Sequence, residues 1–283
     1  LIPRINAAGR IASPLDAVEL LLSEDMDEAR PLAEKLDLYN RRRQAMEKDI
    51  LNEILGQLGT NPDLENMNAL VFSSEKWHPG VVGIVASRLV DLFSRPTFVI
   101  SLKDGVGKGS GRSVSDFNMH KGLQQCASLL LSYGGHYRAA GISIKEDDID
   151  EFACMLDEII RNSVQSSDMV SHTYIDAECH LQDINLDLIN QITRLAPFGC
   201  ENPEPILCAR NIKVSSPAVV GHNHLKMRLT SNGASVNAIW FGMGKYLGAI
   251  NGANLDVVFS PQINYWNGSS DIQLKMKDAA ILA

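Results

Sequence analysis

The sequence predicts a long helix, then an α/β domain, then an all-β barrel. Three observations lead to this fold class: a helical spacing of apolar residues over residues 25–58, a strand–helix–strand order within residues 64–165, and alternating strands joined at Asn-Gly pairs after residue 171. A composition of 45% hydrophobic and 21% charged residues is that of a globular protein, so fibrous and disordered classes are excluded.

The first element is a single helix. Apolar residues recur at helical spacing from Ala29 to Leu58, Pro31 suits a first turn, and Gly59 followed by Asn61 and Pro62 ends the pattern. Long polar helices of this kind often bridge two domains.

The α/β domain begins with a buried strand at residues 68–74, followed by the loop EKWHPG, the helix VVGIVASRLVDLF and the strand PTFVISL. The loop leads to the N-terminus of the helix, where free amides favour an anion. Trp77 and His78 lie in this loop, but a Trp-His-Pro turn could equally fill a core.

Two glycine-rich segments follow. Residues 103–113, KDGVGKGSGRS, read as a loop that offers the Ser110 hydroxyl and the Arg112 guanidinium beside an approachable backbone, which are phosphate-binding groups. A helix over residues 119–133 is expected to lead to the second segment, Gly134-Gly135-His136. If both loops lie at the same end of the sheet, they form one site. AAGISI returns as a strand and DIDEFACMLDEIIRNS as an amphipathic helix.

The C-terminal region predicts about five strands, the number in an OB-type barrel. Asn232-Gly233 and Asn267-Gly268 each separate two alternating runs, a strong hairpin signal. From residue 206 onward seven basic residues face three acidic ones, although the whole chain carries −8. Cations and aromatics on these strands and turns suit single-strand binding: Arg228, Trp240, Phe241, Tyr265, Trp266 and Lys275. At least half of these aromatics are expected in the core instead.

The chain shows no sign of a disulfide framework or a membrane span. Its five cysteines form no C-x-x-C pair and have no regular spacing, which argues against disulfide scaffolds and zinc ribbons. No run of about 18 apolar residues could span a bilayer. We therefore expect a cytoplasmic protein with no membrane contact.

An ordered set of motifs resembles one family. The motifs are PRINAAGR, WHPGVVGIVASRL, GSGRS, GGHYRAAG, LAPFGCENPEP, HLKMRL and YWNGSSDIQL. Together they resemble the RecJ family, single-strand-specific DNA exonucleases of the DHH phosphoesterase superfamily. GGH alone is less specific, since other DHH phosphodiesterases and the related domain of alanyl-tRNA synthetase also carry it.

The resemblance implies four segments: residues 1–24 as the C-terminal remnant of a DHH domain, 25–60 as a connecting helix, 61–168 as a DHH-associated α/β domain, and 169–283 as an OB-type single-strand-binding barrel. The tripeptide DHH is absent from the sequence. This predicts a fragment that binds DNA without cutting it. The Mn²⁺ or Mg²⁺ of the family is then expected in the absent DHH domain, with no metal bound by these residues.

The resemblance also implies a 5′-to-3′ exonuclease of DNA repair and recombination, which hydrolyses phosphodiesters with metal-activated water. His136 is expected as a catalytic donor to the phosphate or transition state. The expected phosphate-binding residues are Ser110, Arg112, Gly134, Gly135, Arg4, Asn6 and Arg10, and the expected strand-binding residues are Lys226, Arg228, Trp266 and Lys275.

The expected partner is single-stranded DNA, and the protein is expected to be a monomer; whether the cell's single-strand-binding protein docks on the barrel is left open. Two alternatives stay open. One is another DHH phosphodiesterase, such as an oligoribonuclease of short RNAs, against which the barrel argues. The other is a non-catalytic single-strand-binding module.

Overall fold

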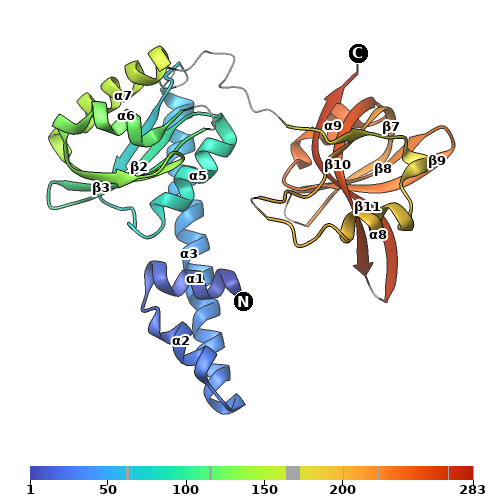
Figure 1. Cartoon of the computed structure of the whole chain (residues 1–283), viewed down its shortest axis with the longest axis horizontal. Helices are drawn as coiled ribbons and strands as arrows, with labels where there is room; N and C mark the ends of the chain where they lie inside the picture. Colours follow the sequence, from blue (N-terminus) through green and yellow to red (C-terminus); the bar gives the residue numbers. More distant parts are fainter. Residues whose placement is uncertain are drawn as a thin grey trace. The chain divides into compact units, whose positions relative to one another are not determined.

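The computed structural model describes residues 1–61, 64, 66–114, 117–163, 173–199, 201–221, 223–266 and 268–282. The chain divides into two compact units, Leu1–Ser171 and His172–Ala283 (Figure 1). Within the described residues, no helix combines the length and the apolar character that a membrane crossing requires.

The first unit begins with three helices. α1 (Ile2–Ile11) and α2 (Leu15–Leu22) pack against the N-terminal half of α3 (Met26–Thr60), as Figure 1 shows. The Asp25 carboxylate caps α3 by accepting hydrogen bonds from the amides of Asp27 and Glu28 at 2.7 and 2.9 Å. The single long helix is thus confirmed, but Pro31 lies in its second turn rather than its first. One stripe of α3 is buried: Leu36, Asn40, Glu47, Ile50, Ile54 and Leu58.

A mixed five-stranded sheet follows, in the order β1-β2-β3-β5-β4. Only β1 and β2 are parallel, and α5 connects them, which confirms the strand–helix–strand prediction. α3 and α5 cover one face of the sheet; α6 and α7 cover the other. The elements are β1 (Leu70–Ser74), α5 (Val82–Phe93), β2 (Thr97–Lys103), β3 (Val106–Arg112), α6 (Met119–Gln125), β4 (Leu130–Gly135), β5 (Ala139–Lys145) and α7 (Ile149–Ser163), with 3₁₀ turns at Ala127–Leu129 and Glu146–Asp148.

The prediction of a glycine-rich loop at residues 103–113 is wrong. Only Asp104 and Gly105 form a turn, both with positive φ, and the residues from Val106 to Arg112 form strand β3. Its alternate glycines leave room for large side chains of the core. A Cβ on Gly107, Gly109 or Gly111 would lie 2.6, 2.7 or 2.3 Å from core side-chain atoms. These glycines therefore serve packing, whereas the sequence predicted a loop whose backbone a ligand could approach.

The expected helix over residues 119–133 is also too long. α6 ends at Gln125, and residues from Leu130 form β4, an edge strand of the sheet. The run Leu129-Leu130-Leu131 therefore includes the start of a strand, which its apolar character alone does not distinguish from a helix. As a result, Gly134 and Gly135 lie on a strand rather than in a loop.

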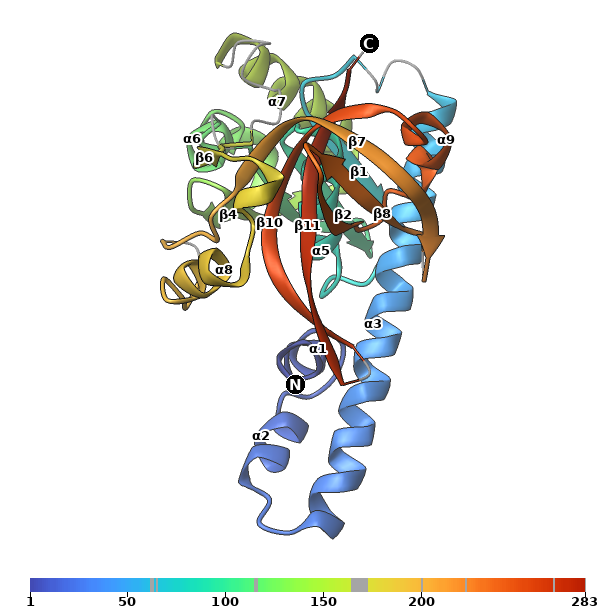
Figure 2. The same ribbon diagram turned by 90° about the vertical axis from the view of Figure 1, so that its right-hand side faces the viewer.

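The second unit is a closed barrel of five long strands, which confirms the OB-type prediction (Figure 2). The sheet has the order β10-β11-β9-β8-β7-β6, in which the short β6 pairs with β7, and a pairing of β10 with β7 closes the barrel. The Asn232-Gly233 turn has positive φ at both residues, as a tight hairpin requires. The elements are β6 (Ala177–Glu178), α8 (Leu186–Thr193), β7 (Leu207–Val220), β8 (His224–Ser231), β9 (Ala234–Trp240), α9 (Leu247–Ile250), β10 (Asn254–Trp266) and β11 (Ser269–Ile281), with 3₁₀ turns at Leu181–Asp183 and Gly244–Tyr246.

Candidate phosphate-binding site and strand-binding face

The alternation of β3 places three polar side chains opposite its core-facing glycines. Lys108, Ser110 and Arg112 lie on the face of the sheet that α5 partly covers. The Arg112 Nη1 donates to the Ser110 Oγ at 3.0 Å and to the Gly111 carbonyl at 2.8 Å. The guanidinium therefore folds back along the strand and lies beside the hydroxyl.

The N-terminal turn of α5 contacts this pair. A Cβ on Gly83, the second residue of α5, would lie 2.8 Å from the Ser110 Oγ and 3.2 Å from the Arg112 Nη2. No side chain caps this end of α5. The positive end of the helix dipole thus lies next to a guanidinium and a hydroxyl, an arrangement that favours a bound anion.

Arg10, at the end of α1, adds a second cation. Burial, and then the positive charge of Arg10, lower the pKa of Arg112 below its ordinary value. Neither arginine forms an ion pair with a carboxylate anywhere in the described ranges. Two neighbouring guanidiniums without a counter-ion repel each other, and a bound phosphate would relieve that repulsion.

The position of Arg10 depends on close packing between α1 and the loop that precedes α5. The Arg10 Nη1 donates to the Gly80 carbonyl at 3.4 Å, and a Cβ on Gly80 would lie 2.0 Å from the Arg10 carbonyl oxygen. His78, in the same loop, accepts a hydrogen bond from the Gly80 amide on its Nδ1 at 3.1 Å. A neutral His78 then carries its proton on Nε2.

The other two α1 residues expected at the phosphate are placed differently. Arg4 pairs with Asp37 of α3, with 2.6 Å between Nη2 and Oδ1. This hydrogen-bonded contact with Arg4 is the main cause that lowers the pKa of Asp37. Asn6 is exposed. No described contact joins either residue to Ser110, so their role in phosphate binding stays a prediction.

The Gly-Gly-His segment forms an open edge of the same sheet. Register places Ser110 opposite Gly141, and Gly141 opposite Gly134, so the three share one face. A Cβ on Gly134 would meet no atom within 4 Å, whereas Gly135 has φ of +150° and leaves no room for a side chain. The His136 amide donates to the Ala139 carbonyl at 2.8 Å, and the residue is exposed. The backbone at Gly134 is therefore accessible to a ligand.

In the barrel, three expected strand-binding cations lie on one outer face. Lys226 on β8 is opposite Ile239 on β9, which is in turn opposite Lys275 on β11. Arg228 lies two positions along β8 from Lys226, and its side chain is exposed. The side chain of Trp266 lies outside what the structure describes. Trp240 is only 7% exposed and stacks on Tyr246 at 5.5 Å between ring centroids, so it belongs to the core.

Sequence reasoning did not single out Gly83 or Lys108, and it left His78 undecided. A signal existed in the spacing: glycines at alternate positions with Lys, Ser and Arg between them are the pattern of a strand with one crowded and one polar face. In the described part of the chain, no group of three or more His, Cys, Asp or Glu residues could hold a metal ion.

Comparison with known proteins agrees with the two units. Residues 66–162 match the family model described as the DHHA1 domain, and residues 175–278 match the one described as the RecJ OB domain.

The whole chain also aligns to named proteins. The single-stranded-DNA-specific exonuclease RecJ of Bacillus subtilis is 36% identical over 99% of this chain and 36% of its own length. Two crystal structures of RecJ from Thermus thermophilus, in complex with Mn²⁺ and with Mg²⁺, are each 30% identical over 98% of this chain, with TM-scores of 0.79 and 0.78. The chain covers 40% and 42% of those two proteins, so it spans well under two thirds of the relatives it matches. With a DHHA1 domain and a RecJ OB domain in that order, and a similar fold over nearly its full length, the chain belongs to the RecJ family.

Proposed function

We propose that this chain holds the 5′ end and the following nucleotides of a single DNA strand for a 5′-to-3′ exonuclease. The observation that carries this proposal is the group formed by Ser110, Arg112, Arg10 and the N-terminal turn of α5. It combines a hydroxyl, two guanidiniums and a helix dipole, all of which favour phosphate.

The charge of this site favours a terminal phosphate over an internal one. A phosphomonoester carries about −1.5 to −2 charges at pH 7, whereas each internal diester carries one. Arg10 and Arg112 supply two positive charges that lack counter-ions among the described residues. We therefore assign the 5′-phosphate to this site, which sets the direction in which the strand is read.

The Gly-Gly-His edge is proposed to hold the strand next to that end. Gly134 leaves its backbone open to a sugar or phosphate, and Gly135 directs the chain toward His136. The exposed imidazole of His136 can donate to a non-bridging phosphate oxygen and so stabilise charge that develops during hydrolysis.

Metal chemistry is proposed to come from a part of the protein beyond these residues. The Thermus RecJ structures were solved with Mn²⁺ or Mg²⁺, and such ions activate water and neutralise charge on phosphate. This chain's own contribution is to bind and orient the strand. Lys226, Arg228 and Lys275 on the barrel are proposed to contact its backbone.

The same proposal extends to the cellular process, the compartment and the partners of the protein. A single-strand exonuclease acts in DNA repair and recombination, and we propose a cytoplasmic monomer that meets single-stranded DNA coated by the cell's single-strand-binding protein.

Fluorescence anisotropy with labelled oligonucleotides tests the proposal. This chain should bind a 5′-phosphorylated single strand more tightly than a 5′-hydroxyl strand or a duplex, and should not cleave it in Mn²⁺. In a longer parent protein, His136→Ala should reduce turnover and leave the melting temperature unchanged. Equal affinity for both 5′ ends would refute the phosphate assignment, and unchanged turnover would refute the role of His136.

A further inference from the structure

The loop between β1 and α5 leads into the phosphate site. It covers residues 75–81 and carries the Trp-His-Pro turn, which has no role in the proposed function. Its last residues continue into the first turn of α5, and its Gly80 contacts Arg10 of α1. The position of this loop therefore determines where two parts of the phosphate site lie.

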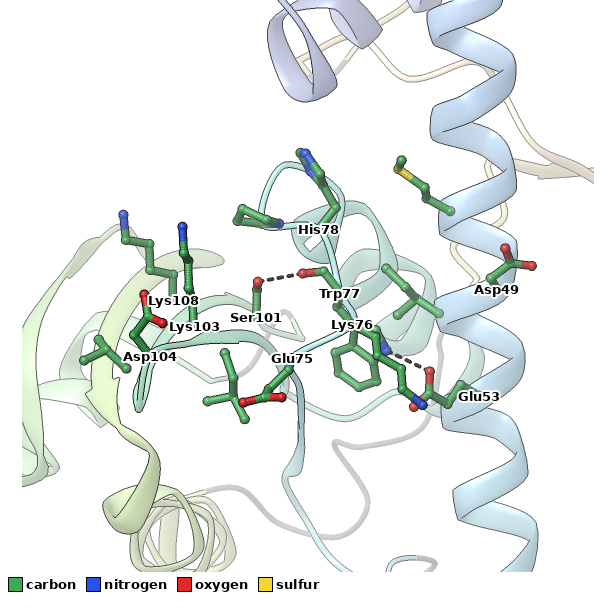
Figure 3. A pocket seen from close by; sticks show the side chains of 15 residues that line it. Asp49, Glu53, Glu75, Lys76, Trp77, His78, Ser101, Lys103, Asp104 and Lys108 are labelled. Carbon is green, nitrogen blue, oxygen red and sulfur yellow. Dashed lines mark hydrogen bonds between the residues drawn. The ribbon is translucent and has the colours of Figure 1, made fainter.

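One side of the loop faces open space rather than packed side chains. A cavity of about 990 Å³ lies between the loop, α3 and the hairpin of β2 and β3 (Figure 3). Glu75, Lys76 and Pro79 are exposed, and within residues 75–80 only Trp77 is buried, with 3% of its surface exposed. Core packing therefore anchors this loop at a single side chain.

Two hydrogen bonds fix Trp77, one through its ring and one through its backbone. Figure 3 shows the indole directed toward α3, where its Nε1 donates to the Glu53 carboxylate at 3.0 Å. The Trp77 carbonyl accepts from the Ser101 hydroxyl of β2 at 2.6 Å. The bond to Glu53 has a charged acceptor, which makes it the stronger kind, and its loss would leave the N–H of a buried ring unpaired.

The loop is also held together between Trp77 and α5. The Val81 amide donates to the His78 carbonyl at 2.9 Å, and the Gly80 amide donates to the His78 Nδ1 at 3.1 Å. These bonds form a tight turn directly before α5, and Gly83 at the start of α5 contacts the phosphate-binding pair on β3. A shift of Trp77 would therefore move Gly80 and the start of α5 with it.

Helix α3 holds both this loop and the helix that carries Arg10. Its N-terminal half packs against α1 in a small cluster that includes Ala8 and Leu36. Glu53 lies further along the same helix and binds the loop. The contact between Gly80 and Arg10 leaves no room for a side chain on Gly80, so a small shift of the loop relative to α3 would disturb it.

We propose that Glu53 is a positioning residue of the phosphate site, which acts through Trp77 to hold Arg10 and the first turn of α5 in place. Ser101 supports the same loop from β2. This inference rests on the proposed function for the identity of the ligand. It gives a role to a carboxylate whose own charge opposes the binding of phosphate.

Fluorescence anisotropy on this chain tests the proposal through the ratio of the dissociation constants for 5′-hydroxyl and 5′-phosphate oligonucleotides. Glu53→Ala should lower this ratio about threefold to tenfold, because Arg10 and the start of α5 lose part of their interaction with the phosphate. Glu53→Gln loses the same charge but keeps an oxygen that can accept from the indole, so it should retain the ratio of the parent. Asp49→Ala, at an exposed position one turn earlier on α3, is the control for loss of a carboxylate that does not bind the indole.

The direction of the effect separates positioning from charge. Loss of a carboxylate near a phosphate by itself strengthens binding of the phosphate, so a lower ratio in Glu53→Ala cannot arise from the charge. Trp77→Phe removes the same hydrogen bond from the other side and should lower the ratio by a similar factor. The double variant should add little to either single change, because both remove one interaction.

The outcomes separate this inference from the proposed function. Equal affinity of the parent for both 5′ ends would refute the proposed function. A parent that prefers the phosphate, with a Glu53→Ala variant that keeps the same ratio or weakens both oligonucleotides equally, would overturn the role of Glu53 alone.

Amide hydrogen exchange tests the loop without any ligand. Glu53→Ala should speed exchange of the Gly80 and Val81 amides, whereas Glu53→Gln should exchange like the parent, because it keeps the bond to the indole. Unchanged exchange in Glu53→Ala would overturn the proposal, whatever the oligonucleotides show.

Discussion

Replacement of Arg112 by alanine should abolish the preference of this chain for a 5′-phosphate. Arg112 is half-buried, lies beside Ser110 and has no carboxylate partner in the described structure, so it is free to bind an anion without breaking an existing ion pair. A hydrogen bond to a charged group contributes about 1.5–3 kcal/mol, which corresponds to roughly 10- to 150-fold in affinity.

The same change should have little effect on folding. The lowered pKa of Arg112 means that its charge is disfavoured in the folded protein, by burial and then by Arg10. Removal of the guanidinium therefore relieves an unfavourable interaction while it removes the hydrogen bonds to the Ser110 hydroxyl and the Gly111 carbonyl. We expect the free energy of unfolding to change by less than about 1 kcal/mol.

The assay is fluorescence anisotropy with matched 5′-phosphate and 5′-hydroxyl oligonucleotides, and the measured quantity is the ratio of the two dissociation constants. Arg30→Ala, at an exposed position of α3, is the control for loss of one positive charge. Arg112→Lys should give an intermediate ratio, because an ammonium keeps the charge but not the bidentate geometry. If Arg112→Ala weakened both oligonucleotides equally, the residue would bind the strand generally and not its end.

Four further changes test other parts of the structure. Gly83→Ala should reduce the 5′-phosphate preference, because the new Cβ would lie 2.8 Å from the Ser110 Oγ and must displace the hydroxyl. That displacement offsets the gain in helix propensity of up to about 1 kcal/mol, so the melting temperature should not rise. An unchanged preference would argue against that contact. Glu47→Ala should lower the free energy of unfolding, measured in urea, by about 3 kcal/mol, because it breaks the buried ion pair of Glu47 with Arg43. This is the low end of the range for buried pairs, since the second arginine partner, Arg88, is 59% exposed. A loss below about 1 kcal/mol would contradict this reasoning. Lys226→Ala with Lys275→Ala should flatten the salt dependence of single-strand binding, with the slope reduced by about 0.7 for each phosphate that the protein no longer neutralises; an unaltered slope would place the strand elsewhere. The pKa of Asp37 is lowered chiefly by its hydrogen bond with Arg4. The ionised carboxylate therefore stabilises the fold above the unfolded pKa, and this stabilisation is lost as pH falls through the folded pKa. Asp37→Asn should thus lose less stability than the parent below about pH 4, and identical acid denaturation curves would count against this role of Asp37.

Local patterns predicted most of the elements in this fold. The spacing of apolar residues identified α3, the β1–α5–β2 order followed from a buried run, a helical run and a second buried run, and the Asn232-Gly233 pair identified a hairpin. Each of these signals arises within a few residues and needs no distant partner.

The errors arose where contacts with neighbouring strands decide the structure. The glycines of β3 are required because Phe98, Ile100 and Ile142, on neighbouring strands, occupy the space that side chains at Gly107, Gly109 and Gly111 would need. β4 becomes a strand through pairing with β5, which follows it in the chain. Neither cause is visible in the local composition, which favours a loop in one case and a helix in the other.

The packing of β3 against its neighbouring strands also positions the residues of the candidate site. Ser110 and Arg112 were expected on a glycine-rich loop, and a loop that is not already ordered must be ordered by the phosphate as it binds, at a cost in conformational entropy. On β3 they lie on a central strand whose other face is fixed by the core through three glycines, and whose neighbours on both sides are hydrogen-bonded. The positions of the hydroxyl and the backbone are thus set before any ligand arrives. Arg10 is held near Arg112 because α1 packs against Gly80, so the closeness of the two guanidiniums depends on a contact between α1 and the loop before α5 that no motif in the sequence encodes by itself.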